Sequence, residues 1–138
     1  MRNLLVALSL LALSFFSAPS FGEESGAAIL VKNGVNAYVK DGASAAIKVW
    51  IAGSGLEGNT QALSQANVLR QIEDYYGKPE GMDQISEHAI TSRSSVIFVA
   101  INYDKGIIYG KFQVYKTKNN VWIVTEFKFN TKADEILP

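Results

Sequence analysis

The sequence predicts an α+β domain in which three helices precede a four-stranded antiparallel sheet. Between residues 25 and 76, apolar side chains recur at the spacing of an amphipathic helix. From residue 84 onward, segments rich in β-branched and aromatic residues follow one another. Their connections are short, and short connections join antiparallel strands. Helices followed by a run of strands are typical of the α+β class, and 138 residues fit one domain.

Three helices are expected before the strands. The first begins after Ser25, a good N-cap, and closes at Lys40-Asp41-Gly42. A shorter helix follows over 44–51, and the glycines of 53–60 predict a loop. Asn59 or Thr60 caps the third helix, which Gly77 and Pro79 terminate. The apolar stripes of the first and third helices are Ala28, Val31, Val35 and Tyr38, and Ala62, Ala66, Leu69, Ile72 and Tyr76.

Four strands are expected over 84–92, 94–103, 107–116 and 121–130. The sequence YDKG predicts a turn between the second and third strands, and TKNN predicts one between the third and fourth. The second strand, SVIFVAINY, is apolar on both sides, so its register stays open. Together these strands predict a meander.

The last hairpin has two different faces if Lys116 lies opposite Val121. In this register the first face carries Phe112, Val114, Ile123 and Phe127, and it is expected to pack on the helices. Lys111 then lies opposite Glu126, a favourable cross-strand pair. The second face mixes aromatic and charged side chains, and we expect it to meet another protein surface, most simply a second copy. The residues of this expected interface are Tyr109, Lys111, Tyr115, Trp122, Val124 and Glu126.

Residues 1–22 have the pattern of a secretory signal peptide. Arg2 precedes an apolar run from Leu4 to Phe16, and small residues allow cleavage after Ser20 or Gly22. The run is too short to span a membrane, which takes about 20 apolar residues. We therefore expect a single domain over 23–138, exported to the periplasm or secreted.

Composition limits the function classes. The chain has no cysteine, so disulfides, thiolate metal sites and a lipid-modified cysteine are excluded. Of 13 basic and 13 acidic side chains, removal of Arg2 leaves 12 basic, a net charge of −1. We expect neither nucleic-acid binding nor a membrane anchor in the mature chain. No metal site or cofactor motif is recognisable, because the chain has one histidine and no phosphate or dinucleotide loop.

The order of elements resembles the nuclear transport factor 2-like (SnoaL-like) superfamily. The segments that carry the resemblance are AILVKNGVNAYVKDGASAAIKVW, QALSQANVLRQIEDYYGKPEG and the run from SSVIFVAINY to ADEILP. The last run also resembles small exported bacterial members without assigned activity. The resemblance implies a cystatin-like cone, in which a curved sheet and the helices enclose a pocket and the outer sheet face pairs subunits. GSGLEGNT departs from it, because many members place a short strand pair there.

Four side chains are candidates for a ligand pocket. His88 is a candidate catalytic base of the kind that superfamily isomerases and dehydratases use, although an ordinary half-exposed strand histidine fits the sequence better. Arg70 and Tyr75 are candidates for a pocket mouth, with a solvated helix flank as the favoured alternative for this stretch. Trp50 is either the cap of a cavity or part of the core.

The sequence therefore favours a non-catalytic exported module that binds a small apolar ligand or assembles as a homodimer, with no cofactor. Two alternatives stay open. One is a small isomerase- or dehydratase-type enzyme with His88 as its base, and the other is a structural subunit of an envelope complex.

Overall fold

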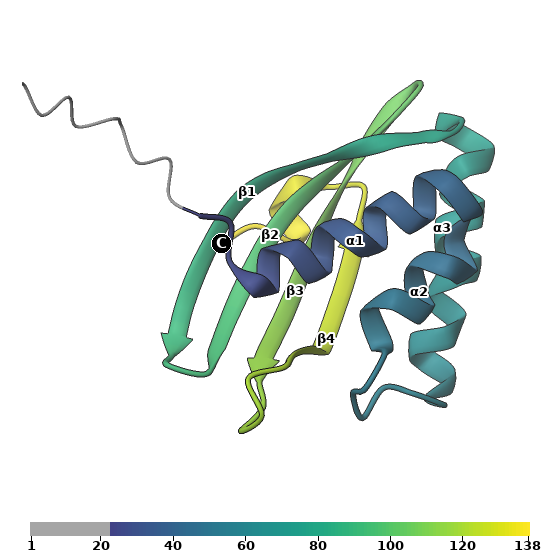
Figure 1. Cartoon of the computed structure of the whole chain (residues 1–138). Coiled ribbons are helices and arrows are strands. Elements are labelled where there is room, and N and C mark those ends of the chain that lie inside the picture. Colours follow the sequence, from purple (N-terminus) through teal and green to yellow (C-terminus); the bar gives the residue numbers. More distant parts are fainter. Residues whose placement is uncertain (1–22) are drawn as a thin grey trace, which may run out of the picture.

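The computed structural model describes residues 23–138, and the predicted signal peptide lies outside them. Three helices precede four strands and a short 3₁₀ turn, which confirms the predicted α+β class (Figure 1). The elements are α1 (Gly26–Asp41), α2 (Ala43–Ile51), α3 (Thr60–Tyr76), β1 (Pro79–Thr91), β2 (Ser94–Tyr103), β3 (Gly106–Lys116), β4 (Trp122–Asn130) and η1 (Ala133–Glu135).

The strands form one antiparallel sheet in the order β1-β2-β3-β4, as predicted for a meander. Figure 1 shows α1 lying across one face of this sheet, with α2 and α3 packed side by side near β4. We call this face the helix side and the opposite face the outer face.

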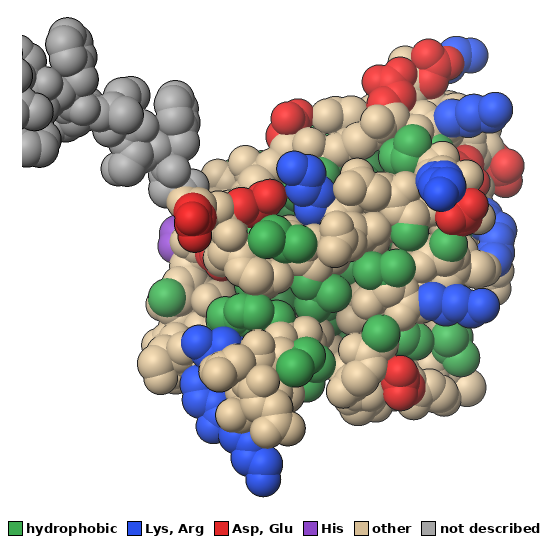
Figure 2. Space-filling model, in the orientation of Figure 1, with side chains coloured by type: hydrophobic (Ala, Val, Ile, Leu, Met, Phe, Trp, Pro, Cys, Tyr) green, Lys and Arg blue, Asp and Glu red, His purple; other side chains and the backbone are tan. Residues whose placement is uncertain are grey.

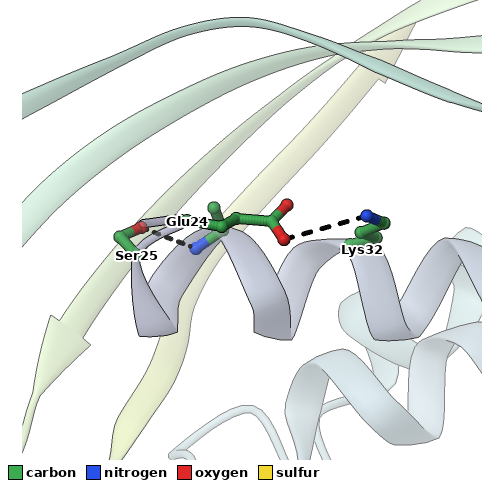
Figure 3. A network of polar contacts seen from close by, with 4 residues as sticks. Glu24, Ser25 and Lys32 are labelled. Atoms are coloured by element: carbon green, nitrogen blue, oxygen red, sulfur yellow. Dashed lines mark hydrogen bonds and ion pairs between the residues drawn. The ribbon is translucent and has the colours of Figure 1, made fainter. Parts of the chain in front are cut away.

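The predicted start of α1 is confirmed by its capping contacts (Figure 3). The Ser25 hydroxyl accepts a hydrogen bond from the Ala28 amide at 3.0 Å, and it donates to the Glu87 carboxylate on β1 at 2.6 Å. Glu24 forms an ion pair with Lys32 at 3.8 Å. The N-terminus of α1 is therefore fixed both within the helix and to the sheet. 

At α3 the cap is Asn59 rather than Thr60. Its side-chain oxygen accepts from the Ala62 amide at 3.0 Å, which satisfies one of the free amides at the helix start.

β1 begins five residues earlier than predicted, at Pro79 instead of residue 84. Proline is tolerated at the first position of an edge strand, where its missing amide costs no ladder hydrogen bond. The pairing of β1 with β2 is interrupted by register shifts, including one between Gln84 and Ser86. These irregularities interrupt the alternation of polar and apolar side chains along β1. Without that alternation the sequence does not indicate where the strand begins.

The open register of β2 is settled by burial. Ile97, Val99, Ile101 and Tyr103 belong to the core beneath the helices. Phe98 and Ala100 point to the outer face, yet they are only 6% and 5% exposed. Something other than the helices therefore covers the outer face of β2.

The predicted register of the last hairpin is wrong. Trp122, not Val121, lies opposite Lys116, and the pairing shifts at a β-bulge around Thr125. Lys111 consequently lies opposite Lys128 rather than Glu126, and Glu126 lies opposite Gln113. A bulge adds one residue to a strand, and this extra residue reverses which of the following or preceding side chains point to each face of the sheet. The residues before the bulge therefore face the side opposite to the predicted one.

This correction moves two predicted interface residues into the subunit itself. Val124 lies opposite Val114 and is completely buried in the helix-side core. Trp122 is half-buried against that core, with its indole beside Gly26 of α1. Phe127 and Phe129, after the bulge, keep their predicted places on the helix side. Figure 2 shows apolar side chains gathered between α1 and this end of the sheet, with charged groups around the margin.

Candidate functional site

On the helix side, where the sequence allowed a ligand pocket, aromatic side chains form a packed cluster. Trp50 of α2 is completely buried, with ring centroids 5.0 Å from Phe112, 5.4 Å from Phe129 and 6.0 Å from Phe127. Its indole nitrogen donates to the Val31 carbonyl at 3.0 Å. Trp50 therefore belongs to the core, the second of the two alternatives that the sequence allowed.

Arg70 and Tyr75 lie on α3, away from this cluster. The Arg70 guanidinium donates to the Asn67 amide oxygen at 2.6 Å and to the Ser44 hydroxyl. It lines a shallow groove between α2 and α3. Tyr75 is 80% exposed. These placements match the solvated helix flank, the alternative favoured for this stretch.

His88 lies on the outer face, on the side of the sheet opposite to Trp50. It pairs with Val96 in the β1–β2 ladder and meets the Phe98 ring edge-to-face, with centroids 6.2 Å apart. The four predicted pocket residues thus occupy separate environments. The structure does not bring them together around one cavity.

A pair of buried tyrosines forms a polar contact inside the helix side; the sequence placed Tyr38 on the apolar stripe of the first helix and gave Tyr103 no role. The Tyr38 and Tyr103 hydroxyls are 2.9 Å apart, and Tyr38 also donates to the Leu69 carbonyl at 3.2 Å. The pair joins α1, α3 and β2. Burial raises the pKa of Tyr103 to about 12 and raises the pKa of Tyr38 further.

We predict that the tyrosine pair makes stability fall steeply in alkali. In the unfolded chain both phenols lose their protons near pH 10, whereas the folded chain keeps them. The unfolded state then binds fewer protons, so stability declines from pH 10 toward 12 by up to about 1.4 kcal/mol per pH unit for each phenol. Urea unfolding across this range measures the slope. Tyr38→Phe combined with Tyr103→Phe should flatten it, whereas Tyr75→Phe should not. An equal slope in all three proteins would contradict the assignment.

The outer face carries an apolar hollow of about 350 Å³ beside His88. It lies over three strands, and its floor includes Phe98. The residues that line it are His88, Ile90, Val96, Phe98, Lys111 and Pro138.

The C-terminal segment forms one wall of this hollow, and sequence reasoning gave it no role. Figure 1 shows the segment turning back from β4 toward β1. Ile136 is 6% exposed although it is not part of the helix-side core, and Pro138 lines the hollow together with Phe98. This segment therefore covers part of the outer face of β2. The apolar run Ile136-Leu137-Pro138 was the only signal for it in the sequence.

The outer face of β3 and β4 carries a mixture of polar and aromatic side chains, which we call the outer patch. Tyr115 is half-buried beneath the Arg93 guanidinium, which lies 4.8 Å from the ring centroid. Four of the six predicted interface residues belong to this patch, and Trp122 and Val124 do not. The outer patch consists of Tyr109, Lys111, Gln113, Tyr115, Ile123, Glu126 and Lys128.

A larger hollow, of about 420 Å³, lies between the start of α3 and the bulged edge of β4. Polar side chains such as Asn59, Gln65 and Glu126 supply most of its lining, and Phe127 also lines it. None of the residues singled out as a ligand or catalytic candidate lines it.

Comparisons of the chain with protein-family models, curated proteins and solved structures found no match. The superfamily resemblance thus stays a prediction. Between residues 23 and 138, no helix is long and apolar enough to cross a membrane. In the same range, no group of three or more His, Cys, Asp or Glu side chains could hold a metal ion.

Proposed function

We propose that this chain is an exported, non-catalytic binding and assembly module that pairs with a second copy through the outer patch. One observation carries the proposal: the helices cover one face of the sheet, and the outer patch on the other face keeps aromatic side chains among charges. Aromatic residues within a polar surround are typical of interfaces rather than of domain interiors. A two-fold axis allows one patch to meet its own copy.

The same arrangement supports the proposed relation to the nuclear transport factor 2-like superfamily. Three helices precede a four-stranded antiparallel meander, and the strands curve around α1 in Figure 1. The resemblance implies pairing through the outer sheet face, which agrees with the location of the outer patch. The pattern of residues 1–22 supports export.

A binding role is favoured over catalysis by the surroundings of His88. Its ring meets the Phe98 ring edge-to-face, and no Asp or Glu side chain lines the hollow beside it. A general base needs a substrate proton within hydrogen-bond reach and a group that orients the imidazole. The hollow offers apolar contact instead.

We predict that Tyr115→Glu converts the protein into folded monomers. A carboxylate at this position would lose its hydration when the two patches close, and removal of an aromatic anchor can cost 2 kcal/mol or more of binding free energy. This corresponds to a loss of about 30-fold in dimer affinity. Light scattering across micromolar concentrations measures the mass, and circular dichroism checks the fold.

Tyr75→Glu is the matched control, because Tyr75 is exposed on α3 outside the outer patch. This variant should stay dimeric. A wild-type protein that is monomeric at high micromolar concentration would reject the proposed pairing.

A further inference from the structure

β4 is an edge strand of the sheet. It pairs with β3 on one side only, so its other side presents backbone N–H and C=O groups that no neighbouring strand uses. In the part of the chain that the structure describes, no backbone hydrogen bond joins residues 126–130 to a helix or loop. This edge is therefore available as a template for another strand.

The usable edge is short. The bulge around Thr125 interrupts β4, and bulges protect an edge against pairing with a long, flat partner. After the bulge, pairing with β3 is regular over 126–130. β1, the other edge strand, begins with a proline and has three register shifts, so it offers no equally regular stretch. A partner strand can thus pair along 126–130 of β4.

The hollow of about 420 Å³ between the start of α3 and β4 turns this edge into one wall of a groove, which we call the α3–β4 groove. Its volume lies within the range of ligand sites, about 300–1,000 Å³. The wall on β4 consists of Glu126 and Phe127, and the opposite wall consists of Leu56, Asn59, Gln61, Ala62, Ser64 and Gln65. Because α3 bounds its far side, the groove has room for an extended segment but not for a second sheet.

The helix wall of the α3–β4 groove is polar and carries no charge. The Asn59 side-chain oxygen accepts from the Ala62 amide, which leaves the Asn59 NH₂ group free to donate. The Ser64 hydroxyl donates to the Gln61 carbonyl at 2.7 Å and keeps its capacity to accept. The glutamine side chains of this wall can both donate and accept. Such a wall complements uncharged polar side chains.

We propose that the α3–β4 groove binds an extended segment of a partner protein, which adds to the edge of β4 as a fifth strand. Its alternate side chains that point toward α3 are uncharged and polar: serine, threonine, asparagine or glutamine. In strand addition the main-chain hydrogen bonds supply affinity, and the pockets for alternate side chains supply specificity.

Two other occupants fit the groove less well. The segment before residue 23 contains the apolar run from Leu4 to Phe16, and α1, which follows it, starts beside β1 at the opposite edge of the sheet (Figure 1). The β4 edge of a second copy would bring Phe127 and Phe129 against the polar wall, since both point to the helix side.

The inference gives the proposed binding and assembly module a second partner, on a surface other than the pairing surface. A fifth strand extends the sheet beyond β4 and leaves Tyr109, Lys111 and Tyr115 of the outer patch uncovered. Glu126 is exposed at the margin and lines both the α3–β4 groove and a small groove on the outer face.

Nuclear magnetic resonance titration of the isotope-labelled protein with the capped peptide acetyl-Thr-Gln-Thr-Asn-Thr-Gln-amide tests the proposal. Saturable shifts are expected for backbone amides of 126–130 and for the side-chain amides of Asn59, Gln61 and Gln65. Alternate amides of 126–130 should also exchange more slowly with solvent. Absence of saturable shifts at millimolar peptide would overturn the proposal, as would shifts confined to the outer patch or the same shifts with maltotriose alone.

Two methylated peptides test the strand pairing itself. One carries N-methyl groups on its threonines, and the other carries them on its remaining residues. Only alternate backbone amides of an added strand point toward β4, so one methylated peptide should bind about tenfold more weakly or worse and the other should bind like the parent. Parent-like binding of both would show that no strand is added.

Variants of α3 test the helix wall. Gln61→Ala and Gln65→Ala should each weaken peptide binding about two- to fivefold, because each removes one hydrogen-bonding side chain. Gln71→Ala is the matched control, since Gln71 is exposed on α3 outside the groove. An equal loss in Gln71→Ala would mean that the effect is not local, and the proposed site would fail.

The Tyr115→Glu variant separates this test from the pairing test, and its monomers should bind the peptide as the wild type does. Peptide binding by a wild type that proves monomeric supports the groove and rejects the pairing. A dimeric wild type that does not bind the peptide rejects the groove alone.

Discussion

Replacing Trp50 with alanine is expected to lower the free energy of unfolding by about 3–5 kcal/mol. The side chain is completely buried, contacts three phenylalanine rings and donates to the Val31 carbonyl. Its removal opens a cavity that the neighbouring side chains on α1, β3 and β4 can only partly refill. Since domains are stable by about 5–15 kcal/mol, this is a large share of the total.

Urea unfolding measures this loss as a lower midpoint with an unchanged slope. Tyr75→Ala is the control, because truncation of an 80% exposed side chain should change stability by less than about 0.5 kcal/mol. A similarly small change for Trp50→Ala would mean that the indole caps an open cavity rather than fills the core.

Gly34→Ala is expected to destabilise the protein by about 1–3 kcal/mol, against the usual preference of helices. Alanine in a helix interior is favoured over glycine by about 1 kcal/mol. A methyl group at Gly34, however, would overlap the Trp50 indole around its nitrogen. The clash would displace the indole and weaken its hydrogen bond to Val31.

A double-mutant cycle separates the two effects. In the Trp50→Ala background the obstructing indole is absent, so Gly34→Ala should become neutral or stabilising. Asn33→Ala, at the neighbouring exposed position of α1, controls for helix propensity alone and should not destabilise. Stabilisation by Gly34→Ala in the wild-type protein would contradict the close packing of α1 on Trp50.

The helices and the order of the strands could be predicted because their signals are local. Ser25 and Asn59 cap the helices that follow them, and both contacts lie within three residues of the chain. The register of the last hairpin could not be predicted, because the prediction assumed that successive side chains alternate strictly between the two faces of the sheet. Val124 and Phe127 are three residues apart and both face the core, which only the bulge between them permits.

The binding surface was predicted only in part for a related reason. Four of the predicted interface residues lie on the outer face as expected, namely Tyr109, Lys111, Tyr115 and Glu126. The changed register before the bulge instead places Trp122 and Val124 on the helix side. The hollow is built from residues of β1, β2 and β3 together with Pro138, which follows Phe98 by 40 residues in the chain. Such long-range contacts leave no periodic pattern in the sequence. The opposed lysines likewise follow from the corrected register.

The most direct test of the central claim, that the outer patch pairs two copies, is cross-linking through a single introduced cysteine. The chain has no cysteine of its own, so Gln113→Cys and Tyr75→Cys each provide one thiol, on the outer patch and on α3 respectively. A bifunctional maleimide with a short flexible spacer should convert Gln113→Cys efficiently into covalent dimers and leave Tyr75→Cys monomeric. Efficient cross-linking at position 75 without cross-linking at position 113 would show that the copies meet through the helix side, contrary to the proposed pairing.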